Sequence, residues 1–532
     1  MYEIEGRTWI GLKKSKYPHS LMNKARALTE NQNKRGGVIL SYISLIISII
    51  GSLFITNRVL NYIGDYNYGL YSFVNSIVAW LNVLSSSLIA SYLRFTAIES
   101  KENDGNIGRT NSLYFKMLLT LGSGILGVGI FILCMLYFGH VTFAKYSWDD
   151  CQLIYLLGLL AVINVSITLP STIFTQYIHY KKQFIFEKTV SIIVTILSFL
   201  FHFVIAYFTR NIIFIALYSV VSTIFVLLVQ FTFCKKKLAI QFGHAPIREN
   251  SLLLRSIFLF SSIMLLNSIV DQINSHVDKT LLGIYSIPEN ITIYQMGQMF
   301  NGYLATLVVA VSSVFVPQIH DLCAKNDKKN VDAVFLRVSR LQGIIVVFVA
   351  FGFVACGYDF ILWWLGETRI YAYYVGAVLM ILSIMPQSVK LALEIQKAQN
   401  KHKFRSFLYF GIALINVALS ILFLNIFPSK YSVFACLLGT VIASLICQVV
   451  AMNIYNKFVM KLPMEKHWLQ LGKQILFGIL SVGLAYSCKF FLLSAIPSLL
   501  FKFILEGTVY VLAYGILLMM FDRKFIFGVI RK

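Results

Sequence analysis

Charged side chains are scarce in this sequence. Only 13% of its 532 residues are Asp, Glu, Lys or Arg, whereas 58% are hydrophobic and the mean hydropathy is +0.74. A soluble domain of this length needs far more charge to cover its surface. Segments of about ten residues with alternating polarity, which mark a transmembrane β-barrel, are missing as well. Repeated apolar runs of about 20 residues, the length that spans a ~30 Å hydrocarbon core, predict an all-α polytopic membrane protein.

Motifs for catalysis and metal binding are also missing. The nine histidines form no HExxH pattern, the eight cysteines form no CxxC pair, and no GxxxxGK[ST] loop is present. No polar stretch is long enough to form a catalytic domain outside the membrane. We therefore expect a transporter and not an enzyme, with no cofactor and no resident metal. Its energy would come from an ion gradient, the membrane potential or removal of the product.

The apolar runs predict fourteen transmembrane helices. Their approximate bounds are 38–60, 69–93, 113–138, 151–176, 189–209, 212–233, 257–283, 291–317, 341–363, 372–389, 406–427, 433–456, 474–496 and 503–521. Residues 1–35 are polar and basic, so we expect no cleavable signal peptide, and Met22 is an alternative start.

Acidic residues are few, and the basic residues are unevenly placed. The 46 Lys and Arg residues outnumber the 23 Asp and Glu residues, which gives a net charge of +23. Thirty-eight of the 46 fall on the two termini and on or close to every second loop between predicted spans, whereas six fall on or close to the other loops. This asymmetry is the positive-inside rule, and it predicts that both termini are cytoplasmic. The positive charge is therefore a topology signal, with attraction to anionic membrane lipids as a second effect, and we expect no nucleic-acid partner.

The spans fall into two blocks of similar length. We expect a cytoplasmic segment at 1–35, a six-helix lobe at 36–233, a basic linker at 234–256, a second six-helix lobe at 257–456, and an appended helix pair with a cytoplasmic tail at 457–532. Because each lobe holds an even number of spans, both lobes have the same orientation. This predicts a parallel repeat around a central cavity.

Two features recur at nearly the same offset in the two lobes. Gly64 and Gly283 are 219 residues apart, and Pro170 and Pro386 are 216 residues apart. Proline removes a helix hydrogen bond in the middle of a span. Pro170 and Pro386 are therefore hinge candidates near a substrate path, with ordinary tolerated kinks as the equal alternative.

The seventh predicted span carries the most polar groups. Asp271, Asn274 (or Ser275) and Asp278 follow the i, i+3/4, i+7 spacing, which places them on one face of a helix. A charge at mid-bilayer costs about 3 kcal/mol on insertion scales, so such residues usually face a cavity or a partner. We interpret the stripe as a site for a monovalent cation or a proton. The alternative is that Asp278 pairs with a neighbouring base.

Two arginines lie near the ends of the first two spans. Arg58 is near the outer end of the first span and Arg94 is at the inner end of the second. A guanidinium offers two parallel donors to a phosphate oxygen pair, so both are candidates for binding a diphosphate headgroup. For Arg94 the alternative is a topology charge.

Five segments resemble one known family, in that family's order. They are NRVLNYIGDYNYGLYSFVNSIVAWL (Asn57–Leu81), VDQINSHVDKTLLGIYS (Val270–Ser286), VFVPQI (Val314–Ile319), FLRVSRLQ (Phe335–Gln342) and LEIQKAQNKHKFRSFLY (Leu393–Tyr409). The first resembles the "R-x-LG-x-x-EYGLY" signature, although its "LG" is spread over residues 60–64, and the second resembles a "D-K-x-x-LG" element. The family is the polysaccharide biosynthesis, or O-antigen and oligosaccharide flippase, family of the multidrug/oligosaccharidyl-lipid/polysaccharide exporter superfamily.

The resemblance implies an alternating-access flippase in the bacterial inner membrane. Its substrate would be an undecaprenyl-diphosphate-linked oligosaccharide used for a surface polysaccharide such as O-antigen, capsule or exopolysaccharide, with a glycan polymerase as a possible partner. Arg58 falls on the family's Arg, and Asp278 and Lys279 fall on its Asp-Lys pair, so the resemblance adds Lys279 to the substrate-binding candidates. The alternative is a multidrug or organic-cation antiporter of the same superfamily.

Overall fold

The computed structural model describes residues 19–102, 107–142, 145–243, 246, 250–399, 401, 403–493 and 498–530. Some side chains inside its helices lie outside the described part, and those of Asp271 and Asn274 are among them. The predictions made for these two residues therefore stay predictions.

Helices make up nearly all of the described chain. The first half contains α1 (His19–Ile63), α2 (Asp65–Val78), η1 (Ala79–Leu81), α3 (Asn82–Glu102), α4 (Gly108–Phe138), α5 (Trp148–Tyr180), α6 (Phe184–Thr209), α7 (Ile212–Lys236) and α8 (Ser251–Tyr285). The second half contains α9 (Pro288–Ala324), α10 (Lys328–Leu365), η2 (Glu367–Arg369), α11 (Tyr371–Ser388), α12 (Lys390–Ala398), α13 (Lys403–Ile426), η3 (Ser429–Tyr431), α14 (Ser432–Ser444), η4 (Leu445–Ala451), α15 (Met452–Phe458), α16 (Met464–Cys488), η5 (Lys489–Leu493) and α17 (Leu499–Ile530). No strand occurs among the described residues.

The all-α membrane fold predicted from the sequence is confirmed. A helix satisfies its own backbone hydrogen bonds, which hydrocarbon cannot do. Twelve helices in the described part of the chain are long and apolar enough to cross a membrane. The other two predicted spans, 69–93 and 257–283, coincide with α2–η1–α3 and with α8, which are helical but carry more polar residues. The count of fourteen crossings stays a prediction.

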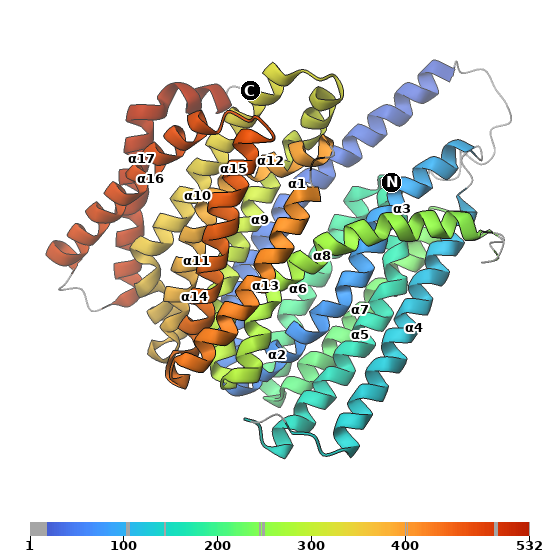
Figure 1. Cartoon of the computed structure of the whole chain (residues 1–532), viewed down its shortest axis with the longest axis horizontal. Helices are drawn as coiled ribbons and strands as arrows, with labels where there is room; N and C mark the ends of the chain where they lie inside the picture. Colours follow the sequence, from blue (N-terminus) through green and yellow to red (C-terminus); the bar gives the residue numbers. More distant parts are fainter. Residues whose placement is uncertain are drawn as a thin grey trace, which may run out of the picture.

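The helices form two groups that lie beside each other (Figure 1). The N-terminal group, α1–α7, contains the close packing of α1 on α6, α4 on α5 and α5 on α7. The C-terminal group, α8–α15, contains the packing of α9 on α11 and of α13 on α14. The groups meet where α2 packs on α9 and α3 packs on α8. The predicted lobe boundaries remain a proposal.

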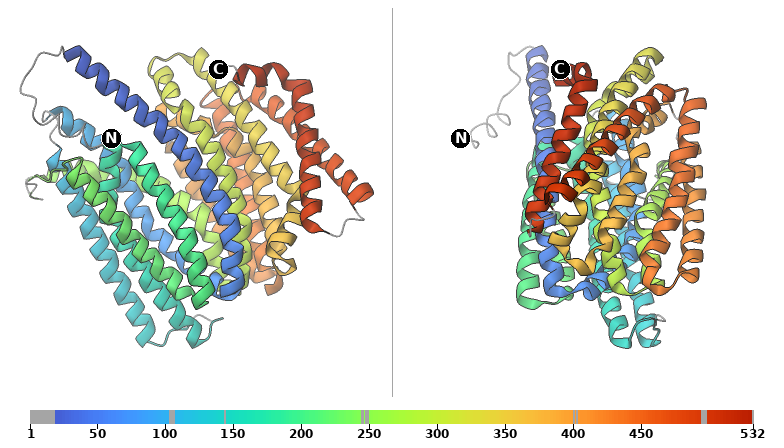
Figure 2. Two further views of the ribbon diagram at one scale, coloured as in Figure 1. Left: turned by 180° about the vertical axis from the view of Figure 1, so that it is seen from behind. Right: turned by 90° about the vertical axis from the view of Figure 1, so that its left-hand side faces the viewer.

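Most helices run roughly along one common axis (Figure 2). The start of α1 and the end of α17 lie at the same end of the molecule, the upper end in Figure 1. We call this end the inner end, because the positive-inside rule predicts that it is cytoplasmic, and we call the opposite end the outer end. Large apolar side chains such as Phe54 and Phe138 are exposed on the flanks, as expected for helices that face lipid.

The helix pair α16–α17 packs against α10 at one edge of the molecule (Figure 1). Tyr510 donates a hydrogen bond to the carbonyl oxygen of Phe348 at 2.8 Å, and Tyr514 donates one to that of Ile344 at 3.2 Å. Within the described part of the chain, the pair contacts the rest of the molecule mainly through this one helix.

The two hinge candidates have different surroundings. Pro170 lies inside α5, which continues for ten residues beyond it. Pro386 lies two residues before the end of α11, where the chain passes into the short helix α12. Pro386 also lines the pocket described below. The hinge roles of both prolines remain predictions.

Candidate functional site

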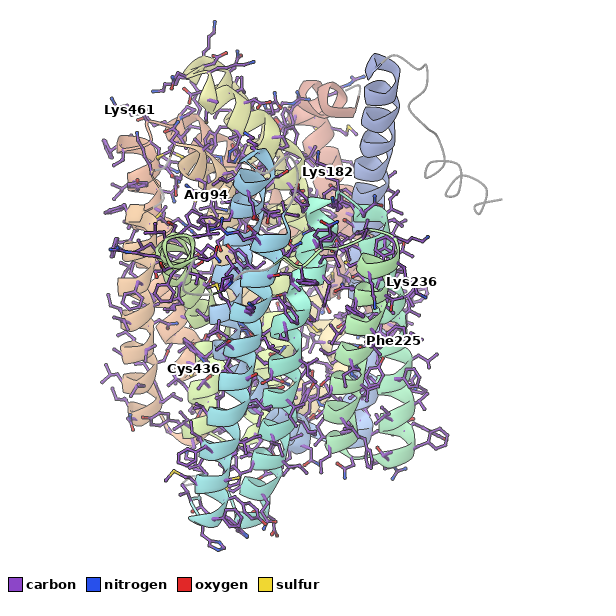
Figure 3. The ribbon with its side chains drawn as sticks, turned by 90° about the vertical axis from the view of Figure 1, so that its right-hand side faces the viewer. Arg94, Lys182, Phe225, Lys236, Cys436 and Lys461 are labelled. Atoms are coloured by element: carbon purple, nitrogen blue, oxygen red, sulfur yellow. The ribbon has the colours of Figure 1, made fainter. Side chains whose placement is uncertain are left out.

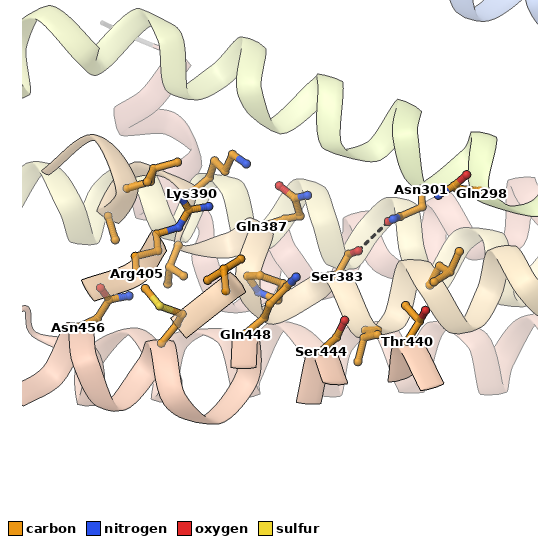
Figure 4. Close-up of a pocket in the computed structure, with 18 of the residues that line it drawn as sticks. Gln298, Asn301, Ser383, Gln387, Lys390, Arg405, Thr440, Ser444, Gln448 and Asn456 are labelled. Atoms are coloured by element: carbon orange, nitrogen blue, oxygen red, sulfur yellow. Dashed lines mark hydrogen bonds between the residues drawn. The ribbon is translucent and has the colours of Figure 1, made fainter. Parts of the chain in front are cut away.

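The C-terminal group encloses a polar pocket of about 430 Å³. Its polar lining comes from α8, α9, α11–α14, η4 and α15, and comprises Asp278, Tyr294, Gln298, Asn301, Ser383, Gln387, Lys390, Gln396, Arg405, Tyr409, Thr440, Ser444, Gln448 and Asn456. Figure 4 labels ten of these residues and marks the hydrogen bond from Ser383 to Asn301 (2.6 Å). Gln448 lies in the π-helical segment η4, a local geometry that is frequent at functional sites.

Asp278 on α8 lies at the end of the pocket that is farther from the inner end. Asp278 is buried, with 4% of its surface exposed. Tyr294 on α9 and Thr440 on α14 both donate to the same carboxylate oxygen, Oδ2, the second at 2.8 Å. The other oxygen, Oδ1, has no hydrogen-bond partner in the described part of the structure. A buried carboxylate with only neutral donors on one oxygen is a strong acceptor for a cation or a proton.

More oxygen atoms surround Asp278. The side-chain oxygen of Asn416 on α13 accepts from Thr440 at 3.4 Å and from Ser420 at 3.3 Å. Asn416 is 3% exposed. Carboxylate, amide and hydroxyl oxygens from α8, α9, α13 and α14 therefore converge at the far end of the pocket, and hard cations prefer ligands of this type.

Two positive side chains lie at the inner end of the same pocket. Lys390 on α12 and Arg405 on α13 both line it and lie at the end opposite Thr440 (Figure 4). The Arg405 guanidinium stacks on the ring of Tyr409, 4.4 Å from the ring centroid. The pocket therefore has positive charge at its inner mouth and a carboxylate at its far end.

Two glutamines that line or adjoin the inner half of the pocket retain unused acceptors. Gln396 is 1% exposed and donates through Nε2 to Asn456 at 2.7 Å. Its Oε1 atom, like that of Gln387, is buried without a hydrogen-bond partner among the described residues. Buried polar atoms are normally satisfied by protein or by ordered water. The lining is thus suited to water or to a small hydrated solute.

A second cavity of about 550 Å³ lies between the two helix groups. It is lined by α1 and α9, with Lys188 of α6 at its side. Its hydroxyl groups belong to Ser41, Tyr42, Ser44, Ser48, Tyr303, Thr306 and Ser313. Tyr42 bridges the groups by donating to the carbonyl oxygen of Ala310 at 3.2 Å. We call this cavity the α1–α9 groove.

The two groups are joined at the outer end. Nε of Arg369 lies 2.7 Å and 3.0 Å from the two carboxylate oxygens of Asp65, and Nη1 donates to Asn61 at 3.1 Å. Thr292 donates to the backbone oxygen of Asp65 at 2.7 Å. Trp364 donates to the backbone oxygen of Leu53 at 2.6 Å. These contacts hold the C-terminal group against α1 and α2 at that end.

The structure does not bring the three predicted phosphate-binding cations together. Lys279 is 7% exposed and donates to Gln295 on α9 at 2.8 Å, so it faces away from the lining around its neighbour Asp278. Arg58 is exposed on α1 and makes no hydrogen bond or ion pair with the described residues. Arg94 is exposed in the inner half of α3 and lies over the Phe260 ring at 4.5 Å (Figure 3). Their roles remain predictions.

A comparison with protein families decides the identity. The family described as "Polysaccharide biosynthesis protein" matches residues 62–370, which is 309 of the 532 residues. The chain belongs to the polysaccharide biosynthesis protein family. The resemblance seen in the five sequence segments is thereby confirmed. No sequence of a curated protein matches the chain.

Solved structures show which fold this polysaccharide biosynthesis family member adopts. The lipid II flippase MurJ, in an inward closed conformation, superposes with a TM-score of 0.68 at 17% identity and covers 92% of this chain and 100% of its own. An inward-facing multidrug resistance MATE family transporter gives a TM-score of 0.58 at 10% identity, and the match covers 84% of this chain and 98% of that transporter. A Vibrio cholerae MATE transporter gives a TM-score of 0.54 at 13% identity, and the match covers 83% of this chain and 100% of that transporter. The fold is therefore that of the MurJ and MATE membrane transporters.

The part that matches the family contains Arg94, Lys279 and Asp278 but ends before the inner mouth of the polar pocket. Lys390 and Arg405 were not singled out from the sequence, because they fall on a loop where the positive-inside rule already accounts for basic residues. Arg369 was also missed. It is one of the six basic residues on the other loops, and that exceptional position is the signal in the sequence that points to it.

Proposed function

We propose that this family member moves an undecaprenyl-diphosphate-linked oligosaccharide across the bacterial inner membrane for surface polysaccharide biosynthesis, by alternating access between the lobes at 36–233 and 257–456. The observation that carries the proposal is the α1–α9 groove between the two helix groups, together with their closure at the outer end. A cavity at the boundary between two groups closes or opens when one group rocks against the other.

The chemistry of the groove suits a glycan headgroup. Hydroxyl groups from both helix groups line it and offer hydrogen bonds to sugar hydroxyls. Lys188 adds an ammonium donor at its side and forms an ion pair with Glu187 at 3.1 Å. The groove also lies between two membrane-crossing helices, so a lipid tail can remain in the bilayer while the headgroup enters.

The exposed guanidiniums Arg58 and Arg94 supply further positive charge on α1 and α3 of the N-terminal group. In the proposed cycle they contact the diphosphate, since an arginine fork matches a phosphate oxygen pair. Lys279 would join them only after a rearrangement that releases it from Gln295.

The polar pocket of the C-terminal group has a different task. At about 430 Å³ it has the size of a site for a small ligand, and it lies within the C-terminal group and not at the boundary between the two groups. We assign Asp278 to binding a monovalent cation or a proton that couples to the cycle. Such a ligand shifts the equilibrium between the two states only if it binds them with different affinity.

The direct test is deletion of the gene in its host, followed by lipid extraction and mass spectrometry. The expected result is accumulation of an undecaprenyl-diphosphate oligosaccharide and loss of one surface polymer. Complementation with the wild type restores the polymer, whereas Arg58→Ala/Arg94→Ala leaves the lipid-linked pool high. An unchanged pool and an intact polymer, in a strain with no redundant flippase, would contradict the proposal.

The second candidate is an organic-cation antiporter, which the likeness to MATE transporters and the buried Asp278 favour. The positive charge of Lys390 and Arg405 at the pocket mouth disfavours it, because it repels a cationic drug. Drug-susceptibility assays in a pump-deficient host separate the two. Resistance that is lost in Asp278→Asn would favour the antiporter.

A further inference from the structure

A cluster of three charged residues joins the α16–α17 pair to α10, away from both cavities. Lys489, at the end of α16, donates to Asp359 of α10 and lies 3.1 Å from Oε1 of Glu506 of α17. The Glu506 carboxyl also lies next to that of Asp359. One basic residue, Lys489, thus contacts two acidic residues that lie on two other helices, α10 and α17.

The two acids of the cluster are deeply buried. The Glu506 side chain is 1% exposed and the Asp359 side chain is 6% exposed, whereas Lys489 is 31% exposed. The second carboxyl oxygen of Glu506, Oε2, is buried without a hydrogen-bond partner in the described part of the chain. Fully ionised, the cluster would hold one uncompensated negative charge among membrane helices, which is strongly unfavourable.

The other titratable groups that face the cluster cannot balance this charge. Among the described residues, Lys502 lies one turn before Glu506 on α17 but makes no ion pair with it. Cys356 and Tyr358 on α10 also face the cluster, and Lys489 lies 5.9 Å from the Tyr358 ring centroid. Neither side chain becomes positive. The adjacent rings Phe360 and Phe503 pack on each other with centroids 5.1 Å apart. These groups do not provide the several oxygen ligands that a metal cation needs, so a proton is the remaining counter-charge.

We propose that Asp359, Lys489 and Glu506 form a proton-binding site that controls the docking of the α16–α17 pair on α10. One proton, taken from the aqueous phase, converts one of the two carboxylates into a neutral carboxylic acid, and the cluster then carries no net charge. Release of that proton returns the unbalanced negative charge and weakens the contact. The site is separate from the proposed function and does not depend on it.

A balanced ion pair at the other end of the same contact provides the matched control. Near the inner end, Arg340 of α10 donates to both carboxylate oxygens of Asp522 of α17, and its guanidinium lies 4.4 Å from the Phe525 ring centroid. Here one base meets one acid. This pair requires no proton, although it ties the same helices together.

The test measures thermal unfolding of the full-length protein in lipid nanodiscs over a range of pH, in an Asp278→Asn background that removes the other buried pocket carboxyl. If the folded protein holds one proton that the unfolded chain releases, the unfolding equilibrium constant rises by up to tenfold per pH unit. The rise begins at the carboxyl pKa of the unfolded chain, about 4, and ends at the pH where the folded cluster loses its proton. Glu506→Gln and Asp359→Asn each leave one acid and one base, so both are expected to fold and to lose this pH dependence. Asp522→Asn is expected to lower stability at every pH but to keep the dependence.

Infrared spectroscopy supplies a second readout. A carbonyl band of a protonated carboxylic acid is expected in the parent protein and in Asp522→Asn, and is expected to be absent in Glu506→Gln and in Asp359→Asn. Lys489→Gln, which leaves two acids without a base, is expected to unfold at lower temperature than either neutralised variant. A pH dependence or a carboxylic acid band that survives in both Glu506→Gln and Asp359→Asn would overturn the proposal.

Discussion

Arg369 and Asp65 form an ion pair that links η2 of the C-terminal half to the first residue of α2 in the N-terminal group. Nε of the arginine lies 2.7 Å and 3.0 Å from the two carboxylate oxygens. The two side chains are 11% and 22% exposed, so solvent screens their attraction only weakly. The pair lies beside Thr292, which binds the backbone of Asp65. It therefore stabilises the contact between the two helix groups at the outer end.

We predict that Asp65→Asn opens the outer end more often. Loss of one partner from a largely buried pair costs roughly 3 kcal/mol, and this cost falls on the closed state alone. A cysteine introduced as Thr292→Cys, 0% exposed in this structure, should then react faster with a membrane-impermeant thiol reagent in intact cells.

The exchanged pair Asp65→Arg/Arg369→Asp is the control for this prediction. It restores opposite charges across the boundary and should slow the labelling again. Equal labelling of the parent, the single variant and the exchanged pair would show that the ion pair does not hold the outer end closed.

We predict that Asp278 binds a monovalent cation or a proton in the polar pocket. A ligand at a hundredfold excess over its Kd stabilises the folded protein by about 2.7 kcal/mol. Adding Na⁺ or lowering the pH should raise the Tm of the wild type, and Asp278→Asn should abolish the response. Thr440→Val, which removes a donor to the carboxylate and a nearby oxygen, should weaken it.

Asp522→Asn is the matched control, because Asp522 is a half-buried carboxylate that lies outside the pocket. It should keep the full response to Na⁺ or to protons. Transport by an Asp271→Asn/Asp278→Asn variant at the wild-type rate, with and without an ion gradient, would remove the coupling role of the α8 stripe.

We predict that Lys390 and Arg405 hinder cations at the inner mouth of this pocket. The variant Lys390→Gln/Arg405→Gln should bind the cation several-fold more tightly at low ionic strength, because two repulsive charges are removed. The difference should shrink at about 0.15 M salt, where the Debye length is about 8 Å. Titration of the Tm against cation concentration at two ionic strengths measures both effects.

Lys430→Gln tests whether any lost positive charge has the same effect, since Lys430 lies in η3 at the outer end and contacts the Tyr431 ring. It should leave the affinity unchanged. Equal affinity in the double variant and the wild type at low salt would refute the role of the mouth.

We predict that Gly69→Ala separates α2 from α9. A Cβ atom at Gly69 would lie 2.0 Å from the backbone oxygen of Pro288, which cannot move without moving α9. Overpacking of this kind costs about 1–3 kcal/mol. The variant should unfold at lower temperature and expose Thr292→Cys to the thiol reagent. Gly124→Ala in α4, where no atom lies within 4 Å, should change neither.

The membrane class and the positions of the helices were predictable from the sequence because they depend on local quantities. Each apolar run is long enough to cross the bilayer by itself. Each must be helical, because only a helix satisfies the hydrogen bonds of its own backbone within one segment. The observed helices α4, α5, α6 and α7 include the corresponding predicted spans. The family was predictable as well, because its motifs are contiguous segments of the chain.

The site was only partly predictable. The polar face of the seventh span pointed to Asp278, and the structure places that residue at the far end of the pocket. Its neighbours Thr440 and Asn416 lie more than 130 residues away on other helices, and a single serine, threonine or asparagine in an apolar span carries no signal of its own. Lys279 follows Asp278 directly, yet the turn of the helix directs it to Gln295 on α9.

Exceptions to the charge pattern proved more informative than the pattern itself. Of the six basic residues outside the positive-inside loops, Arg369 pairs with Asp65 of α2, Lys489 pairs with Asp359 of α10, and Lys145 donates to the backbone oxygen of Tyr285. A basic residue that violates the topology rule needs another source of stabilisation, and for these three that source is a polar contact between distant segments.

The sequence by itself determined the membrane class, the helical spans, the charge asymmetry and the family, because hydrophobic length, charge placement and contiguous motifs are properties of neighbouring residues. Only the tertiary structure decided which polar groups meet. The pocket around Asp278, its positive mouth, the pair Asp65–Arg369 and the cluster around Glu506 each join helices that are far apart in the chain. Their geometry depends on how helices pack against one another, and a small rotation of one helix would direct the same side chains elsewhere.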